Sequence, residues 1–298
     1  MKPFFSIVTP LYNKEKYIYQ TVISVLKQTF TNYEYIIIDD GSTDNSSSII
    51  KSFNDNRIKY YAIENSGVSN ARNYGIYKSK GKFICFLDAD DIWDENYLLE
   101  LKHILEKERD ADFICSGYNY FSENTKNILK RKLLKDLPQN KYSIINFLEI
   151  CAKNKWCIAL TSAVCIKREI LYQLEKPFMP NISIGEDMDC WIRSALISKK
   201  AIYLNKALMY YRDEDNSSLC HKRTSLVNKT CPYWEWYKLS SNKDLKKITT
   251  LIIYAFARDQ YKAKNYHQAV EILNKIKGNY LLSKRLATKL ICLFKQLI

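Results

Sequence analysis

Three aspartates stand together where one apolar run of the sequence ends, in residues 86–91 (FLDADD). Carboxylates this close repel one another unless a positive charge lies among them. A divalent cation with hard oxygen ligands, itself bound to a diphosphate, supplies that charge. We therefore expect these three carboxylates to surround a cation. The alternative is a charged loop in which Asp91 or Asp94 caps the next helix.

Two more carboxylates, Asp39 and Asp40, follow the apolar residues 35–38. An acidic side chain at the end of a buried strand can accept hydrogen bonds from a ribose hydroxyl or from a base N–H. An Asx turn before a helix is the alternative, and the residues by themselves leave both open.

Arg72 lies within residues 66–75, where glycine supplies backbone freedom at the start of an expected helix. A guanidinium binds phosphate or carboxylate through a planar fork of donors. Arg72 is thus a candidate to contact a phosphorylated ligand or to orient the acidic residues, and a surface arginine is the alternative.

A second acidic group, formed by Glu186, Asp187 and Asp189, lies far along the chain. If this group faces the first one, a carboxylate there can remove a proton from a hydroxyl group. Alternatively, Asp187 caps the helix that carries Trp191.

The elements that must position these residues alternate along the N-terminal part of the chain. Short apolar runs at 5–9, 35–39, 58–63 and 82–87 are separated by helical patterns, which is typical of parallel strands buried on both faces. The sequence therefore predicts an α/β fold with a mostly parallel central sheet and helices on both faces. Ligands of such sheets bind beyond the carboxyl ends of the strands, here after Thr9, Ile38 and Leu87.

The rest of the chain predicts a different organisation. We expect a strand at 112–118, a loop at 123–141, and amphipathic helices beyond about 243. The predicted division is a domain at 1–220 and a basic helical region at 221–298.

Bulk composition limits the classes of function. Nine cysteines without C-x-x-C spacing and three histidines argue against a zinc site and indicate free thiols in a reducing compartment. Neither a secretory signal nor a long apolar run is seen, so we expect a cytoplasmic protein, with any membrane contact peripheral on the cytosolic face of the inner membrane.

The net charge of +14 is concentrated near the C-terminus, where residues 243–298 hold twelve Lys and Arg against three Asp and Glu. Within residues 281–298, leucines at helical spacing lie near lysines and an arginine, a pattern typical of a helix at an anionic membrane surface. A solvated basic face, or a helix packed on the catalytic domain, is the alternative.

Taken in order, these residues resemble family 2 inverting glycosyltransferases with the GT-A fold. The likeness is dense over residues 4–110, thins as far as about 218, and is absent beyond. The segments that carry it are residues 6–13 (SIVTPLYN), 38–44 (IDDGSTD), 67–75 (GVSNARNYG), 86–91 (FLDADD) and 185–191 (GEDMDCW).

The resemblance implies a role for each matching residue. Pro10, Tyr12 and Asp40 would line the nucleobase pocket, and Arg72 would lie beside the nucleotide. Asp88 would face the ribose or the metal, and Asp90 would bind the Mn²⁺ or Mg²⁺ that bridges the phosphates. Asp187 would be the general base that deprotonates the acceptor hydroxyl for attack with inversion.

The resemblance also implies that 1–220 is the catalytic domain, with a nucleotide-binding half (1–110) and an acceptor half (111–220). It implies the partners as well. They are a nucleotide-sugar donor, with UDP the first nucleotide to test, and a glycan or lipid-linked saccharide acceptor of bacterial surface-glycan assembly, with no nucleic acid. One departure stands out: many relatives have a histidine after a Tyr-Arg pair, and Glu214 occupies that position here.

Two other functions remain as alternatives. A non-catalytic module that binds nucleotide sugars or polyanions would account for the basic tail, but the candidate pocket residues are acidic. A nucleotidyltransferase would need a phosphate loop rich in glycine and lysine, which the sequence lacks.

Overall fold

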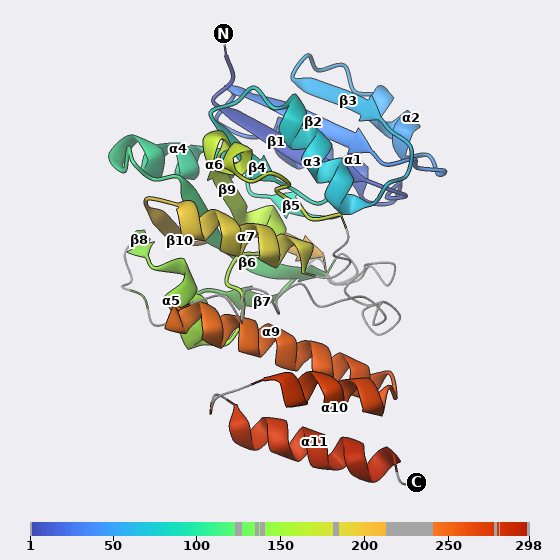
Figure 1. The fold of residues 1–298 in the computed structure, drawn as a ribbon. Helices are drawn as coiled ribbons and strands as arrows, with labels where there is room; N and C mark the ends of the chain where they lie inside the picture. The colour runs from blue at the N-terminus through green and yellow to red at the C-terminus, as the bar shows by residue number, and fades with distance from the viewer. Residues whose placement is uncertain are drawn as a thin grey trace. The chain divides into compact units, whose positions relative to one another are not determined.

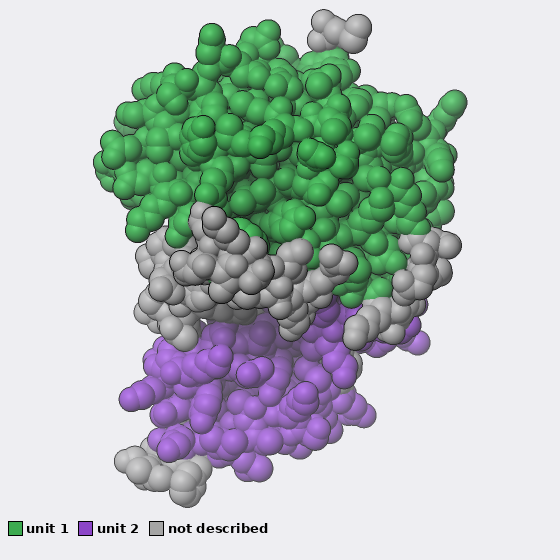
Figure 2. Space-filling view, turned by 180° about the vertical axis from the view of Figure 1, so that it is seen from behind, with its two compact units in different colours: residues 1–145, 159–180, 187–215 green, residues 146–158, 181–186, 216–298 purple. Residues whose placement is uncertain are grey.

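The structure is a computed structural model that describes residues 2–122, 127–134, 137, 141–180, 185–212, 241–276, 279 and 281–296. The chain divides into two compact units, which Figure 2 colours separately. Unit 1 comprises residues 1–145, 159–180 and 187–215, and unit 2 comprises residues 146–158, 181–186 and 216–298.

Unit 1 is built on one sheet, which has ten strands among the described residues. Eight of them follow the order β3-β2-β1-β4-β9-β6-β10-β5, and β7 and β8 pair with β6 and β10 off this path. The first part of this order is parallel: β1 (Phe5–Leu11) pairs with β2 (Tyr33–Asp39) and β4 (Phe83–Phe86), and β2 pairs with β3 (Ile58–Ala62). Every residue of β2 and β4 is buried, which explains the apolar sequence of β4 and of residues 35–38 in β2.

The second part of the sheet is mixed. The strand β9 (Val164–Lys167) runs antiparallel to both β4 and β6 (Phe113–Ser122), and β6 is parallel to β10 (Ala201–Arg212). Three short strands pair antiparallel to these: β5 (Ile92–Trp93) and β8 (Tyr142–Ile145) to β10, and β7 (Asn127–Lys132) to β6.

Helices flank the sheet of unit 1, and Figure 1 shows α3 (Val68–Lys78) crossing β1 and β2. The other helical segments that include residues of this unit are α1 (Ile18–Leu26), α2 (Ser46–Lys51), α4 (Tyr97–Lys107), α6 (Arg168–Gln173), α7 (Glu186–Ile197) and the 3₁₀ turn η1 (Thr161–Ala163). The mixed, largely parallel sheet with its flanking helices confirms the predicted α/β class.

Unit 2 is helical in its described residues. The helix α5 (Phe147–Asn154) contacts α9 (Lys243–Lys262), and α10 (Tyr266–Lys275) packs against both α9 and α11 (Leu282–Gln296). None of the helices formed by the described residues combines the length and apolar composition needed to cross a bilayer.

One expectation about secondary structure is wrong. The stretch 123–141 was predicted to be a loop, but its residues Asn127–Lys132 form β7, which pairs antiparallel with β6. The reason is tertiary: a polar, lysine-rich segment shows no strand periodicity, yet the neighbouring strand offers a row of backbone donors and acceptors for it to pair with.

Candidate active site

Residues 88–91, here called the acidic loop, follow β4 at the carboxyl edge of the sheet. An arginine holds the first aspartate of this loop, Asp88. Arg72 Nη2 donates to Asp88 Oδ1 at 2.8 Å. The Arg72 side chain is 5% exposed, and its guanidinium carbon lies 5.2 Å from the centre of the Phe178 ring. The burial of Arg72 and its contact with Asp88 exclude the alternative of a surface arginine.

The second aspartate of the loop pairs with a residue that sequence reasoning missed. Lys14 Nζ lies 2.7 Å from Asp90 Oδ2, and these two side chains are 17% and 18% exposed. Lys14 follows the carboxyl end of β1, which neighbours β4 in the sheet. The rule that parallel strand ends meet at one edge was the signal that could have found it.

The third aspartate is an internal anchor of the loop. Asp91 is buried, its Oδ2 accepts from Ser162 Oγ at 2.5 Å, and its Oδ1 accepts from the Arg212 amide at 3.2 Å. Burial, and then the neighbouring carboxylates of Asp90 and Asp88, raise the pKa of Asp91 well above its ordinary value. Its position inside the protein sets it apart from Asp88 and Asp90.

Two hydroxyl side chains hold the backbone of the acidic loop. Thr21 of α1 is fully buried and donates to the carbonyl oxygens of both Ala89 and Asp91, at 3.0 and 2.9 Å. Ser162 Oγ also accepts from the Asp88 amide at 3.0 Å. The loop is therefore fixed before any ligand binds, which is how a pre-organised binding site is built.

The predicted base, Asp187, is connected to this loop through η1. Thr161 Oγ1 donates to Asp187 Oδ2 at 3.0 Å, and the next residue, Ser162, makes the contacts to Asp88 and Asp91. The contacts of η1 thus connect Asp187, from the second acidic group, to the acidic loop. Neither Thr161 nor Ser162 carries a sequence signal that singles it out.

Asp189, two residues after the predicted base Asp187, makes structural contacts. Its carboxylate accepts from Arg193, which also donates to the carbonyl oxygens of Lys176 and Pro177. These contacts hold the segment that ends in Phe178, the residue under Arg72.

Phe178 is fixed from a second side. Asn73 donates to the Phe178 carbonyl at 2.6 Å and accepts from its amide at 2.9 Å. The ring packs against Phe86 and Trp191, with centroids 5.3 and 5.5 Å away. The asparagine that follows Arg72 therefore secures the surface on which Arg72 rests.

Asp39 and Asp40 make contacts with different segments of the chain. Asp39 accepts from the Ser42 amide at 2.8 Å and from the Tyr60 hydroxyl at 2.6 Å, so the Asx-turn alternative describes it. Asp40 is buried and accepts from the Ser66 and Gly67 amides at 2.8 and 2.9 Å. Its carboxylate fixes the turn that enters α3, where Gly67 has a φ of 90°.

The loop after β1 completes this edge of the sheet. Pro10 lies opposite Ile38 in the register of β1 and β2, and Tyr12 is 48% exposed. Asn13 has a φ of 50°, and its side chain accepts from the Thr43 amide at 2.8 Å. The exposed ring of Tyr12 is therefore carried by a loop that the next loop along the edge holds in place.

The acidic loop offers an incomplete set of metal ligands. Among the residues that the structure describes, no cluster of three His, Cys, Asp or Glu side chains could hold a metal ion. Magnesium-like cations are, however, commonly bound by one or two carboxylates together with substrate phosphates and water. The oxygens of Asp88 and Asp90 fit a cation that binds together with a diphosphate. Glu214 lies outside the described residues.

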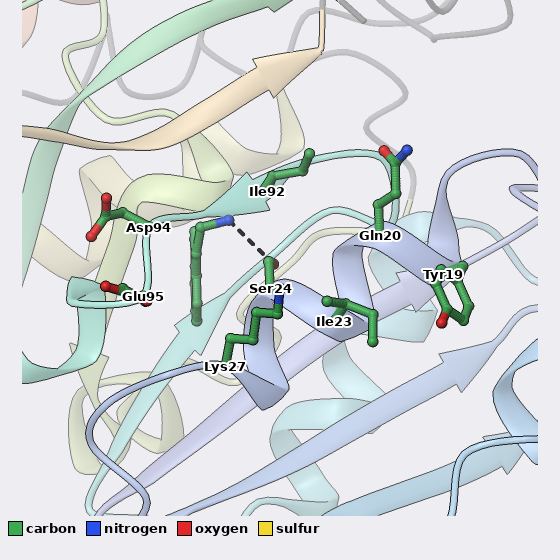
Figure 3. Close-up of a pocket in the computed structure, with 9 residues that line it drawn as sticks. Tyr19, Gln20, Ile23, Ser24, Lys27, Ile92, Asp94 and Glu95 are labelled. Carbon is green, nitrogen blue, oxygen red and sulfur yellow. Dashed lines mark hydrogen bonds between the residues drawn. The ribbon is translucent and has the colours of Figure 1, made fainter. Parts of the chain in front are cut away.

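A groove of about 400 Å³ lies elsewhere on unit 1, between α1 and β5 (Figure 3). Its residues are Tyr19, Gln20, Ile23, Ser24, Lys27, Ile92, Trp93, Asp94 and Glu95. Ser24 Oγ accepts from the Trp93 amide at 3.3 Å, the bond that Figure 3 draws. The groove contains none of the predicted site residues, so we place the candidate active site at the acidic loop.

Comparison with known sequences gives consistent matches. The family described as Glycosyl transferase family 2 matches residues 6–173. Glycosyltransferase GlyG of Streptococcus pneumoniae is 32% identical over 224 residues, which are 73% of this chain and 73% of GlyG. The Escherichia coli protein WfaP, named as a UDP-Glc:α-D-GlcNAc-diphosphoundecaprenol β-1,3-glucosyltransferase, is 31% identical over 76% of this chain and 83% of its own.

Comparison with solved structures shows the same fold. Residues 1–349 of TarS from S. aureus, solved in complex with UDP-GlcNAc, give a TM-score of 0.70 at 17% identity, covering 98% of this chain and 89% of that one. The mannosyltransferase PcManGT from Pyrobaculum calidifontis, solved with GDP-Man and Mn²⁺, gives a TM-score of 0.61 at 16% identity, covering 97% and 81%.

Proposed function

Because the chain belongs to glycosyl transferase family 2, we propose that it transfers a sugar from a UDP-sugar to a hydroxyl of a glycan or lipid-linked saccharide with inversion, in bacterial surface-glycan synthesis. The observation that carries this proposal is the pair of contacts from Arg72 to Asp88 and from Lys14 to Asp90, at the edge where α/β sheets bind their ligands. The names of WfaP and of the TarS complex support UDP, and WfaP supports a lipid-linked acceptor.

The residues at the carboxyl ends of β1 and β2 would bind the nucleoside. In the proposal the exposed ring of Tyr12, beside Pro10, covers the base, and Asp40 accepts from a base N–H at Oδ2, the oxygen that also accepts from the Gly67 amide. Arg72 and Asp88 would then lie beside the ribose and the diphosphate, where the guanidinium fork suits phosphate oxygens.

The proposed general base is Asp187. Its carboxylate would take the proton of the acceptor hydroxyl as that oxygen attacks the anomeric carbon from the face opposite the departing UDP. Thr161 holds the carboxylate by a hydrogen bond, so the base is oriented before the acceptor arrives.

The proposed cation is Mn²⁺ or Mg²⁺, held by Asp88 and Asp90. When bound, it would neutralise the charge that develops on the departing diphosphate. PcManGT, which shares the fold, was solved with Mn²⁺. The contribution of the chain is to present two carboxylate oxygens on a loop that Thr21 and Ser162 hold in a fixed shape.

The test is a panel of nucleotide sugars, with hydrolysis and transfer measured with and without Mn²⁺. We expect turnover of a UDP-sugar, and a loss of about a hundredfold or more in Asp90→Ala and Asp187→Asn, the scale on which charge stabilisation and general base catalysis operate. Glu175→Ala, which removes an exposed carboxylate, is the matched control. Binding of a UDP-sugar without turnover would instead favour the non-catalytic module.

We also propose that residues 221–298 form a basic helical region that contacts an anionic membrane surface on the cytosolic side, while 1–220 form the catalytic domain. The boundary between them lies outside the described residues. The helix α11 contains lysines and an arginine but no acidic residue. Its exposed apolar side chains are Leu282, Leu286, Leu290, Ile291 and Leu293, and the four leucines lie at helical spacing.

Liposome flotation tests this membrane contact. The full-length protein should float with vesicles that contain anionic lipid and remain behind with neutral ones, because burial of the leucines and attraction of the lysines act together. The double variant Leu286→Glu/Leu290→Glu should lose the partition. Equal partition of both proteins would remove the proposal.

A further inference from the structure

We infer that Lys14 is an exchangeable partner of Asp90, which leaves the carboxylate for the diphosphate of the donor when a divalent cation binds Asp90. The inference rests on the proposed function and assigns a positioning role to a residue outside the motifs singled out in the sequence. It starts from the 2.7 Å distance between Lys14 Nζ and Asp90 Oδ2.

The two ion pairs at the acidic loop differ in how firmly their basic side chains, Arg72 and Lys14, are held. Arg72 is buried, rests on the Phe178 ring and donates to Asp88 through Nη2, so several contacts hold its guanidinium in place. Lys14 carries a compact ammonium on a flexible four-carbon stem, 5.9 Å from the centre of the Tyr17 ring, and its side chain is more exposed than that of Arg72. Of the two basic side chains, Lys14 is therefore the one that can move away from its carboxylate.

The backbone beneath Lys14 is fixed, so the movement is confined to the side chain. Its amide donates to Ser46 Oγ at 2.9 Å, and its carbonyl oxygen accepts from the amides of Tyr17 and Ile18 at 2.9 Å each. The preceding residue, Asn13, is held in a left-handed conformation by the loop that follows β2. The Lys14 side chain can thus change partner while its backbone stays in place beside the acidic loop.

Charge forces the exchange. A divalent cation on Asp90 would lie within a few ångströms of the Lys14 ammonium, and two positive charges at such a distance repel strongly in a partly buried site. The diphosphate offers the displaced ammonium a new anionic partner in the same region. The cation and the nucleotide therefore each favour the binding of the other, and such a coupling is reciprocal.

The partners of the three carboxylates in the acidic loop show how the loss of Lys14 should change ligand binding. Of its three carboxylates, Asp88 is paired with Arg72, and Asp91 is buried against Ser162 and a backbone amide. Asp90 is paired with Lys14. Removing the ammonium should make Asp90 a better ligand for a free cation and a poorer site for a free diphosphate, so the two affinities should change in opposite directions.

Isothermal titration of the full-length protein tests the inference, with MnCl₂ alone, UDP alone in the presence of EDTA, and UDP at saturating Mn²⁺. In Lys14→Met we expect Mn²⁺ alone to bind about three- to fivefold more tightly and UDP alone to bind more weakly by a similar factor, which is the scale of one partly exposed ion pair. The mutual enhancement of the two ligands should shrink accordingly.

The matched control is Lys16→Met, which removes the same charge from an exposed residue two positions away and should bind as wild type does. Lys14→Gln is the second variant, and circular dichroism checks that all of them fold. Weaker or unchanged Mn²⁺ binding in both Lys14 variants would overturn the inference, as would equal changes in Lys16→Met. Absence of Mn²⁺ and UDP binding in the wild type would instead count against the proposed function.

Discussion

Thr161 donates its hydroxyl to Asp187 at 3.0 Å, and through this contact a short 3₁₀ turn joins two acidic groups that lie almost one hundred residues apart in the sequence. The next residue, Ser162, holds the other group, since it binds both the amide of Asp88 and the carboxylate of Asp91. The geometry of the candidate site therefore depends on two adjacent hydroxyl residues of η1 as much as on the carboxylates themselves.

Replacement of Thr161 should affect the chemical step. Thr161→Val keeps the shape of the side chain but removes the donor that orients Asp187, so we expect kcat to fall about tenfold while the KM for the donor sugar changes little, the scale of one hydrogen bond to a charged group. Steady-state kinetics at varied donor concentration measure this. Thr161→Ser restores the hydroxyl and should recover most of kcat; a Ser variant as slow as the Val variant would contradict the role.

Replacement of Ser162 should affect stability. Ser162→Ala leaves the buried carboxylate of Asp91 without its hydroxyl donor and the Asp88 amide without its acceptor. Unpaired buried polar groups cost about 1–3 kcal/mol each, so the midpoint of urea unfolding should fall clearly. Ser48→Ala, at an exposed position of α2, should leave the midpoint unchanged. A Ser162 variant as stable as wild type would show that Asp91 finds another donor.

The parts of this site that follow from sequence are those with a strong local pattern. Continuous apolar runs predicted β1, β2 and β4, and the rule that parallel strands end at one edge predicted that Asp40 and Asp88 follow neighbouring parts of that edge. The acidic loop was found because three carboxylates in four residues are costly without a compensating charge.

The parts that escaped sequence reasoning depend on contacts between distant segments. Thr161 and Ser162 are ordinary residue types of a 3₁₀ turn, and only the assembled sheet brings them to the acidic loop, whereas Lys14 lies where the strand-end rule could have found it. The pairing of β7 with β6 has the same origin, since backbone hydrogen bonds to a neighbouring strand leave no trace in a polar sequence.

Acid should loosen the loop that carries Lys14. Partial burial disfavours the charge on Asp44, but hydrogen bonds from Ser46 and from the Glu15 amide outweigh it, so the pKa of Asp44 lies below its ordinary value. A carboxyl whose pKa is lowered by folding adds stability above its unfolded pKa and loses it as the pH falls through the folded pKa. The wild type should therefore lose stability as the pH falls below about 4.

Asp44→Asn isolates that contribution. The variant should be less stable than wild type at neutral pH, and its stability should fall less steeply as the pH is lowered, because it has no charge at this position to lose. Urea titrations at several pH values give both slopes. Glu175→Gln, at an exposed position, is the control and should follow the wild type. Parallel curves for wild type and Asp44→Asn would show that the contacts of Asp44 do not favour its charged form.

The close packing of α3 on β1 yields the last prediction. A Cβ added to Gly75 would lie 2.3 Å from Val8 Cγ1, far inside van der Waals contact, and Val8 is fully buried. Alanine in a helix usually stabilises by about 0.5–1 kcal/mol relative to glycine, but overpacking costs about 1–3 kcal/mol. Because a 2.3 Å contact cannot be relieved by rotating a β-branched valine alone, we expect Gly75→Ala to be net destabilising.

A double-mutant cycle with Val8→Ala separates this clash from other causes. Val8→Ala alone should destabilise by leaving a cavity. Gly75→Ala/Val8→Ala should be more stable than the sum of the single changes predicts, since the new methyl group occupies the cavity and the shorter residue 8 removes the clash. Urea unfolding of the four proteins gives the interaction energy. Costs that simply add would mean that α3 moves away from β1 instead, and UDP affinity would then fall in Gly75→Ala, because α3 also carries Arg72 to Asp88.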